Sequence, residues 1–311
     1  MTEPAAVEVA SLTKRFAALT AVDGLSFSVA RGEIFGLVGP DGAGKTTVMR
    51  MLAGVMRPDA GTVILDGVDV VSDPELAKRH LSYMPQRFGL YEDLTVDENI
   101  RFYADLFGIA RGLREERAKR LLAASGMEPF RGRLAGKLSG GMKQKLGLTC
   151  SLIHAPKAVL LDEPTTGVDP VSRRDFWRIL YSLLGEGVTI VIATAYLDEA
   201  ERCHRLALLD RGRLIQCDTP AALKQKMPGA LVAIASPDPR RVRSALEDEP
   251  GVQTVVLVGD GVHLVVDDAG RIAELERRLA DQGVPYEHIA RVTPSVEDLF
   301  AALLGRKAED G

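Results

Sequence analysis

One segment constrains this chain more than any other: residues 39–46, which read GPDGAGKT. The segment fits G-x-x-x-x-G-K-[ST] without a gap, and it lies between an apolar run ending at Val38 and a stretch, 45–55, with helical apolar spacing. Glycines let backbone N–H groups approach phosphate oxygens, and a helix start adds partial positive charge. We therefore predict a nucleotide site in which Lys45 contacts the β- and γ-phosphates and Thr46 ligates Mg²⁺. The expected nucleotide-binding residues here are Gly39, Pro40, Asp41, Gly42, Ala43, Gly44, Lys45, Thr46 and Thr47.

Two adjacent carboxylates, Asp162 and Glu163, follow the apolar run that begins at Ala158. By itself this pattern fits a strand end with solvated acids. Beside a phosphate site, two acids would repel the ligand unless a divalent cation and a water lie between them. We therefore predict that Asp162 binds the metal ion and that Glu163 is the general base for the attacking water.

A third motif, Ser-Gly-Gly, stands at residues 139–141 inside the stretch LSGGMKQ. Ser139 can cap the following helix, and the two glycines leave its first N–H groups open to an anion. In isolation the same residues fit an ordinary helix cap.

The middle of the chain alternates short apolar runs with helical patterns, which predicts a mostly parallel sheet covered by helices. A polar-rich helical stretch from Thr95 to about Ala135 interrupts this alternation. The predicted strands are 34–38, 158–162, 188–194 and 205–210, and the predicted helices are 45–55, 172–185 and 197–203.

Around residues 226–230 the sequence KMPGA breaks the pattern. The elements predicted after it, strand 230–235, helix 239–248, strands 252–258 and 262–266, helix 271–282 and strand 284–290, have the order of a split βαβ, ferredoxin-like arrangement. A last helix should begin after Thr293-Pro294 and pack against its own domain. Its apolar face would consist of Val296, Leu299, Phe300, Leu303 and Leu304.

Length, composition and net charge limit the number of domains and the classes of partner that we expect. The length of 311 residues favours two domains, and the net charge of −4 gives no basic footprint for nucleic acid. No secretory signal and no apolar run of about 20 residues is evident, so the expected location is cytoplasmic. The three cysteines show no metal-type spacing.

Taken together, residues 5–225 resemble the ATP-binding subunit of ABC transporters, and LSGGMKQ is the most specific part of the likeness. The resemblance implies two copies that sandwich two ATP molecules, with Ser139 and Gly141 of one copy facing the γ-phosphate held by Lys45 of the other. It further implies that Phe16 stacks on adenine and that Gln86 links Mg²⁺ and water to a transmembrane partner. The signature and crossing-loop residues implied at the nucleotide are Ser139, Gly140, Gly141, Gln144 and Asp169.

The predicted fold is accordingly α/β. A P-loop ABC ATPase domain would span residues 1–228, with a helical subdomain at about 87–137. A small α+β ferredoxin-like domain, accessory or regulatory, would span 229–311.

Two residues depart from the family pattern. Asp41 is an acid where the family often has a neutral polar residue, and we expect its side chain to turn outward. Ala195, after Thr194, stands where the family usually has a histidine that contacts the γ-phosphate. Losing one such contact typically lowers the rate by about 10²–10³ without abolishing it.

The function expected from this resemblance is that of an ATPase subunit of an exporter in the ABC-2-type or multidrug branch, with ATP and Mg²⁺ as cofactors. Its partners would be a second ATPase subunit, forming a homodimer or a pair, and a separate transmembrane permease that holds it at the cytoplasmic face of the membrane. Tyr91 and residues 102–107 are candidate permease contacts, although they equally fit the core of the helical subdomain. The alternatives are an ATPase-impaired regulatory subunit, because of Ala195, and a non-transport ABC ATPase acting on DNA or ribosomes.

Overall fold

The computed structural model describes residues 4–259 and 261–309. The chain divides into two compact units. The first runs to Tyr196 and resumes over Cys203–Cys217, whereas the second comprises Leu197–Arg202 and the chain from Asp218 onward. This division falls earlier than the predicted boundary at residue 229, because two short helices before that point pack against the C-terminal helix.

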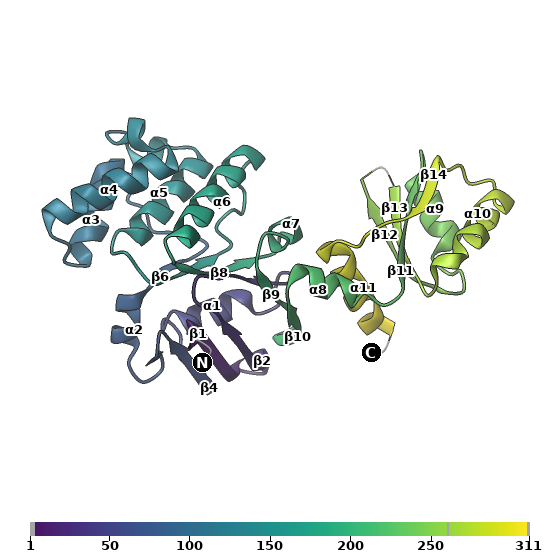
Figure 1. Ribbon diagram of the computed structural model, residues 1–311, viewed down its shortest axis with the longest axis horizontal. Coiled ribbons are helices and arrows are strands. Elements are labelled where there is room, and N and C mark those ends of the chain that lie inside the picture. Colours follow the sequence, from purple (N-terminus) through teal and green to yellow (C-terminus); the bar gives the residue numbers. More distant parts are fainter. Residues whose placement is uncertain (1–3, 260, 310–311) are drawn as a thin grey trace. The chain divides into compact units, whose positions relative to one another are not determined.

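The first unit is built around a six-stranded sheet of order β10-β9-β3-β8-β7-β6 (Figure 1). The ladders from β9 through β3, β8 and β7 to β6 are parallel, as the alternating pattern predicts. Every residue of β3, β7 and β8 is buried, which explains their continuous apolar runs. The strands are β3 (Ile34–Val38), β6 (Leu81–Met84), β7 (Ala158–Asp162), β8 (Thr189–Thr194), β9 (Arg205–Asp210) and β10 (Arg213–Asp218).

A second, antiparallel sheet of order β2-β1-β4-β5 belongs to the same unit. In its hairpin, β1 (Val7–Phe16) and β2 (Leu19–Val29), exposed residues, many of them polar, alternate in part with buried apolar ones. Strands β4 (Ala60–Leu65) and β5 (Val68–Asp69) complete the sheet. One apolar core, with Phe27 and Phe35 stacked at 5.2 Å, joins both sheets to helix α1 (Lys45–Leu52).

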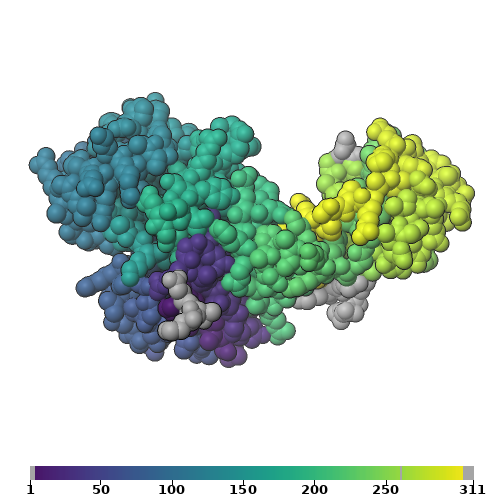
Figure 2. Space-filling model, in the orientation of Figure 1, coloured from purple at the N-terminus to yellow at the C-terminus, as the bar shows by residue number. Residues whose placement is uncertain are grey.

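The helices that follow β6 gather into a lobe of the first unit, which stands at the upper left in Figure 2. Helix α3 (Val96–Leu106) begins with a capping box between Thr95 and Glu98, and it packs with α4 (Arg111–Ser125) and α5 (Gly140–Leu152). Helix α6 (Pro170–Gly185) contacts α4 and α5. The predicted helical stretch 95–135 thus consists of α3, α4 and short 3₁₀ turns. Helix α2 (Pro74–His80) precedes β6.

The second unit contains an antiparallel sheet of order β12-β13-β11-β14. Its elements follow the chain order strand, helix, strand, strand, helix, strand, which is the order of the split βαβ arrangement. They are β11 (Ala230–Ala235), α9 (Pro239–Leu246), β12 (Val252–Val258), β13 (Gly261–Val266), α10 (Ile272–Asp281) and β14 (His288–Arg291). Helix α11 (Val296–Glu309) packs against β12, α7 (Leu197–Ala200) and α8 (Pro220–Gln225).

One prediction about this unit differs from the structure in detail. The strand predicted at 284–290 begins only at His288, since Pro285 has no N–H to pair and its carbonyl accepts a hydrogen bond from Ser236 at 2.7 Å. On α11, Val296, Leu299 and Phe300 are buried and Leu303 is partly buried. The side chain of Leu304 lies outside the described part of the chain.

Among the helices of the described residues, none combines the length and the apolar character needed to cross a membrane.

Candidate nucleotide site

The loop between β3 and α1 brings backbone N–H groups close together. Gly44 caps α1 with φ 99° in the left-handed region, which favours glycine. A Cβ at Gly44 would lie 2.5 Å from the carbonyl oxygen of Ala21, and one at Gly39 would collide with the carbonyl oxygen of Leu209. Larger residues at either position would therefore push the loop away from its neighbours. The helix that begins at Lys45 directs its free N–H groups into this loop.

Lys45 is buried, with 4% of its surface exposed. Its ammonium donates hydrogen bonds to the carbonyl oxygens of Gly39 at 2.8 Å and Pro40 at 3.0 Å. It also forms an ion pair with Glu163 at 3.2 Å. A buried ammonium needs such partners, and these hold its charge at the mouth of the loop.

Asp162, the last residue of β7, is fully buried. The Thr46 hydroxyl donates to its Oδ1 at 3.0 Å, and the Tyr83 hydroxyl donates to its Oδ2 at 3.2 Å. Burial raises the pKa of the Asp162 carboxyl, and these two hydrogen bonds oppose that shift. Burial and the adjacent Asp162 also raise the pKa of Tyr83 to about 12, so its phenol is a donor at neutral pH.

Glu163 follows with a backbone φ of 49°, an unusual value for a non-glycine residue. Its N–H donates to the carbonyl of Ala193 at 2.9 Å, which fixes it beside the end of β8. Its Oε2 accepts hydrogen bonds from Gln86 and Thr166, both at 3.3 Å. The carboxylate is thereby turned toward Lys45 and the loop.

Several of these groups line an open pocket of about 690 Å³, whereas Gly39, Pro40 and Asp162 of the predicted set lie outside its lining. Phe16, with 44% of its surface exposed, lines it, and so do Gln86, Glu163 and most of the loop. Asp41 is exposed and belongs to the same lining. The pocket therefore brings together Phe16, Asp41, Gly42, Ala43, Gly44, Lys45, Thr46, Thr47, Gln86 and Glu163 from the predicted set.

Sequence reasoning missed four residues of this lining and one hydrogen-bond donor. Arg211 lines the pocket from the turn after β9, where its φ of 46° marks an unusual backbone. The turn itself, Arg-Gly after a buried strand, was a visible signal. Tyr83 could be found only from the pairing of its strand, β6, with β7, which ends in Asp162. The other lining residues missed are Leu19, Thr20 and Ala21.

The predicted signature and crossing-loop residues lie elsewhere: among the described residues, none from 139 to 144, and not Asp169, lines this pocket. Ser139 caps α5, accepting a hydrogen bond from the Met142 N–H at 3.3 Å. Gly141 is packed so closely that an added Cβ would lie 2.5 Å from the Ser172 side chain. Asp169 caps α6 through the N–H groups of Val171 and Ser172.

Ala195 follows β8, where Thr194 pairs with Val38 at the end of β3. Ala195 is exposed, and it lies at the carboxyl edge of the sheet, where the loop between β3 and α1 also begins. Its methyl group has no atom that can donate a hydrogen bond. Nor does His204 take its place, since its Nδ1 accepts from the Ile34 N–H at 3.1 Å.

The residues present fit a magnesium ion shared with a nucleotide. In the described part of the chain, no cluster of three or more His, Cys, Asp or Glu side chains could hold a metal ion by itself. Mg²⁺ is usually held by one or two protein oxygens together with substrate phosphates and water. The Thr46 hydroxyl and the buried Asp162 carboxylate, 3.0 Å apart beside the loop, supply two such oxygens.

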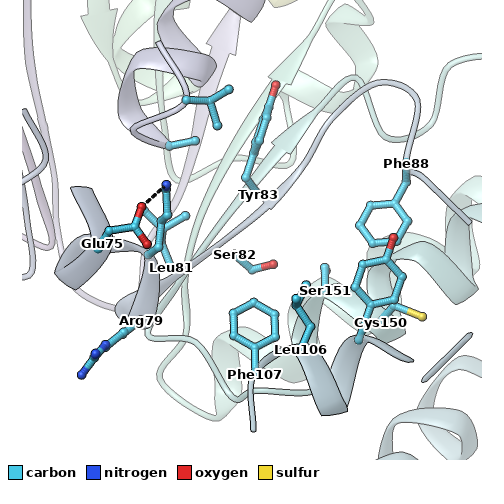
Figure 3. A pocket seen from close by; sticks show the side chains of 14 residues that line it. Glu75, Arg79, Leu81, Ser82, Tyr83, Phe88, Leu106, Phe107, Cys150 and Ser151 are labelled. Carbon is cyan, nitrogen blue, oxygen red and sulfur yellow. Dashed lines mark hydrogen bonds and ion pairs between the residues drawn. The ribbon is translucent and has the colours of Figure 1, made fainter. Parts of the chain in front are cut away.

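A second hollow, which we call the groove, measures about 840 Å³ and lies among α2, β6, α3 and α5. Phe88, Leu106 and Phe107 line it in Figure 3, where the Tyr83 hydroxyl points away from Phe107. Phe107 stacks on His154 at 3.9 Å, whereas Leu106 has 68% of its surface exposed. Tyr91 and Phe102, in edge contact at 4.6 Å, are also exposed on this lobe.

Comparison with known proteins gives consistent matches. The family model described as ABC transporter matches residues 22–166. A Nod factor export ATP-binding protein I from Paraburkholderia xenovorans (strain LB400) is 38% identical and covers 98% of this chain and 99% of its own length. The probable multidrug ABC transporter ATP-binding protein YbhF from Escherichia coli (strain K12) is 45% identical over 97% of this chain. This chain spans only 52% of the length of that relative.

Solved structures agree on the fold. The structure of an ATP binding subunit of an ABC transporter superimposes with a TM-score of 0.65 at 30% identity, covering 71% of this chain and 92% of that one. The cbiO1 protein from Clostridium perfringens, part of an ABC transporter complex, gives a TM-score of 0.66 at 23% identity, covering 80% of this chain and 97% of that one. The second likeness concerns the fold alone.

Proposed function

The chain belongs to the ATP-binding subunits of ABC transporters, and from that premise we propose that it binds and hydrolyses MgATP to drive an exporter. One observation carries the proposal. Lys45, Thr46 and Glu163 line one pocket at the carboxyl edge of the parallel sheet, where α/β proteins bind ligands, and the buried Asp162 lies 3.0 Å from the Thr46 hydroxyl. The names of the relatives, multidrug transporter and Nod factor export, support export as the direction.

The proposed roles follow from the contacts of each side chain. Phosphate oxygens would replace Glu163 as the anionic partner of Lys45, which leaves the Glu163 carboxylate free to accept a proton from the attacking water. Gln86, 3.3 Å from that carboxylate, would orient it. Mg²⁺, when bound beside Thr46 and Asp162, supplies positive charge to the β- and γ-phosphates. The products are ADP and phosphate.

A pair of ATPase subunits is part of the proposal. Ser139 and the N-terminus of α5 offer unpaired N–H groups, yet the pocket of their own chain lies elsewhere among the described residues. A second copy facing the first would bring this helix start to the γ-phosphate. Asp169, at the start of α6, would lie in the same interface.

The groove is the proposed docking site of a separate transmembrane permease, which would hold the chain at the cytoplasmic face of the membrane. Exposed Leu106, Phe107 and Tyr91 give this part of the lobe an apolar surface of the kind that partner helices cover. The C-terminal unit would be an accessory or regulatory module.

Gel filtration tests the sandwich. Glu163→Gln removes the base but retains the binding cation, so the variant should bind ATP and elute as a dimer when ATP and Mg²⁺ are present. The same variant without nucleotide should elute as a monomer. A strictly monomeric profile in both conditions would contradict the paired arrangement.

A second candidate function, an ATPase-impaired regulatory subunit, rests on Ala195. The methyl group at this strand end leaves one stabilising contact to the γ-phosphate unmade. The two candidates differ in a measurable way: an active enzyme loses turnover when Glu163 is replaced, whereas an inactive one has none to lose.

A further inference from the structure

Asp162 is held at both of its oxygen atoms by hydroxyl groups from different elements. Thr46 on α1 donates to Oδ1 at 3.0 Å, and Tyr83 on β6 donates to Oδ2 at 3.2 Å. The carboxylate is fully buried, so neither oxygen can turn to bulk water for a replacement donor. The two hydrogen bonds together fix the rotation of the carboxylate.

The two donors approach from different surroundings. Thr46 lines the nucleotide pocket, and it is the hydroxyl expected to ligate Mg²⁺. Tyr83 instead lines the groove with its ring, while its hydroxyl points away from Phe107 toward Asp162 (Figure 3). Oδ1 is therefore the oxygen on the phosphate side, and Oδ2 is the oxygen held back by Tyr83.

A cation and a second contact reinforce this arrangement. Arg50, one helical turn after Thr46 on α1, acts electrostatically on both Tyr83 and Asp162. Three residues beyond Tyr83, Gln86 holds the other acid, Glu163, at 3.3 Å. Strand β6 and the segment directly after it thus contact Asp162, the last residue of β7, and Glu163, the residue that follows it.

We propose that Tyr83 is a positioning residue for the metal site: its hydroxyl holds Oδ2 of Asp162 so that Oδ1 faces Mg²⁺ beside Thr46. This inference rests on the proposed function, because it assumes that MgATP occupies the pocket. Without the phenol, the buried carboxylate could rotate and share the single Thr46 donor between its oxygens. Removing such outer partners of a metal ligand typically weakens metal affinity by about 10–100-fold.

The test measures how much Mg²⁺ strengthens ATP binding. Isothermal titration calorimetry would follow ATP binding to the full chain carrying Glu163→Gln, which prevents turnover, in EDTA and in Mg²⁺. Adding Tyr83→Phe should leave the affinity in EDTA within about twofold, since the loop and Lys45 hold the phosphates. The gain in affinity from Mg²⁺ should fall by about tenfold. Tyr83→His, which restores an N–H donor on a ring, should recover part of that gain.

Tyr103→Phe is the matched control. Tyr103 lines the same groove, but its hydroxyl donates to the carbonyl of Gly89 at 2.7 Å and does not contact Asp162. Its removal should leave the Mg²⁺ gain unchanged. An unchanged gain in Tyr83→Phe, an equal loss in EDTA, or a Tyr83→Phe protein that does not fold would each overturn the inference. Absence of ATP binding by the Glu163→Gln parent would instead contradict the proposed function, and this inference with it.

Discussion

The nucleotide pocket and the groove are hollows of similar size in one unit, about 690 and 840 Å³, but their walls are built differently. In the pocket, the Lys45 ammonium is held by three contacts, to the carbonyl oxygens of Gly39 and Pro40 and to the Glu163 carboxylate. The groove instead presents exposed apolar side chains, among them Leu106 and Phe107. Chemistry requires preorganised charge, whereas docking of a partner helix requires apolar area.

Removing the cation of the nucleotide pocket should have the largest effect. Lys45→Ala should lower ATP hydrolysis by at least about 10²–10³, because a charge aimed at the phosphates is lost. Steady-state phosphate release measures it. Lys78→Ala is the control, since Lys78 lines the groove and pairs with Glu75 at 2.6 Å on the surface. A comparable loss in both variants would mean that the two hollows do not differ in this way.

A substitution in the groove should affect binding of the permease and leave ATP hydrolysis unaffected. Leu106→Ser should leave the basal ATPase rate unchanged and weaken binding of a co-expressed transmembrane subunit by about tenfold, as for a central apolar contact. Stimulation of hydrolysis by the permease in nanodiscs is the readout. Leu113→Ser, at an exposed leucine on α4 outside the groove lining, should change neither quantity. If the permease stimulates hydrolysis by the Leu106→Ser variant as much as by the parent, the groove is not the docking site.

A smaller effect should come from the wall of the groove formed by α2. Asp66 pairs with His80, at the end of α2, at 2.8 Å, and also with Arg31 and Lys157. Burial by itself would raise the pKa of Asp66, but these partners outweigh it and hold the pKa below its usual range. Asp66→Asn should therefore lower the free energy of unfolding at pH 7 by about 1–3 kcal/mol, with little effect on ATP binding.

The pH dependence of that effect has a defined sign. The folded-state pKa lies below the unfolded value of about 3.9, so the stabilisation by Asp66 is complete above that value and is lost as the pH falls toward the folded pKa. Urea unfolding followed by the fluorescence of Trp177, the single tryptophan and part of the first unit, measures it. A difference between variant and parent that persisted undiminished into strong acid would refute the assignment to Asp66 ionisation.

Local patterns predicted several of the residues that the structure brings together around Lys45. The glycines and Lys45 lie within eight consecutive residues, and Asp162 and Glu163 follow directly from an apolar run. Such features depend on neighbours in the chain, so spacing reveals them. Phe16 and Gln86, assigned by resemblance, also line the pocket, and their roles there stay predictions.

Features that depend on distant residues could not be predicted in this way. The Tyr83–Asp162 hydrogen bond joins residues 79 positions apart, and only the pairing of β6 with β7 brings them together. The extent of the second unit likewise depends on distant residues. Helices α7 and α8 contact α11, and no local sequence pattern predicts these contacts. One example is the hydrogen bond that the Val296 N–H donates to Glu201 at 2.9 Å.

We propose that Glu163 and Lys45 form a working ATPase site despite Ala195. Single-turnover hydrolysis of radiolabelled ATP by the parent, Glu163→Gln and Ala195→His proteins tests it most directly. The account predicts measurable turnover in the parent, a loss of about 10²–10⁴ in Glu163→Gln, and a rate for Ala195→His that is equal to or above that of the parent. A parent whose rate cannot be distinguished from that of Glu163→Gln would contradict the claim.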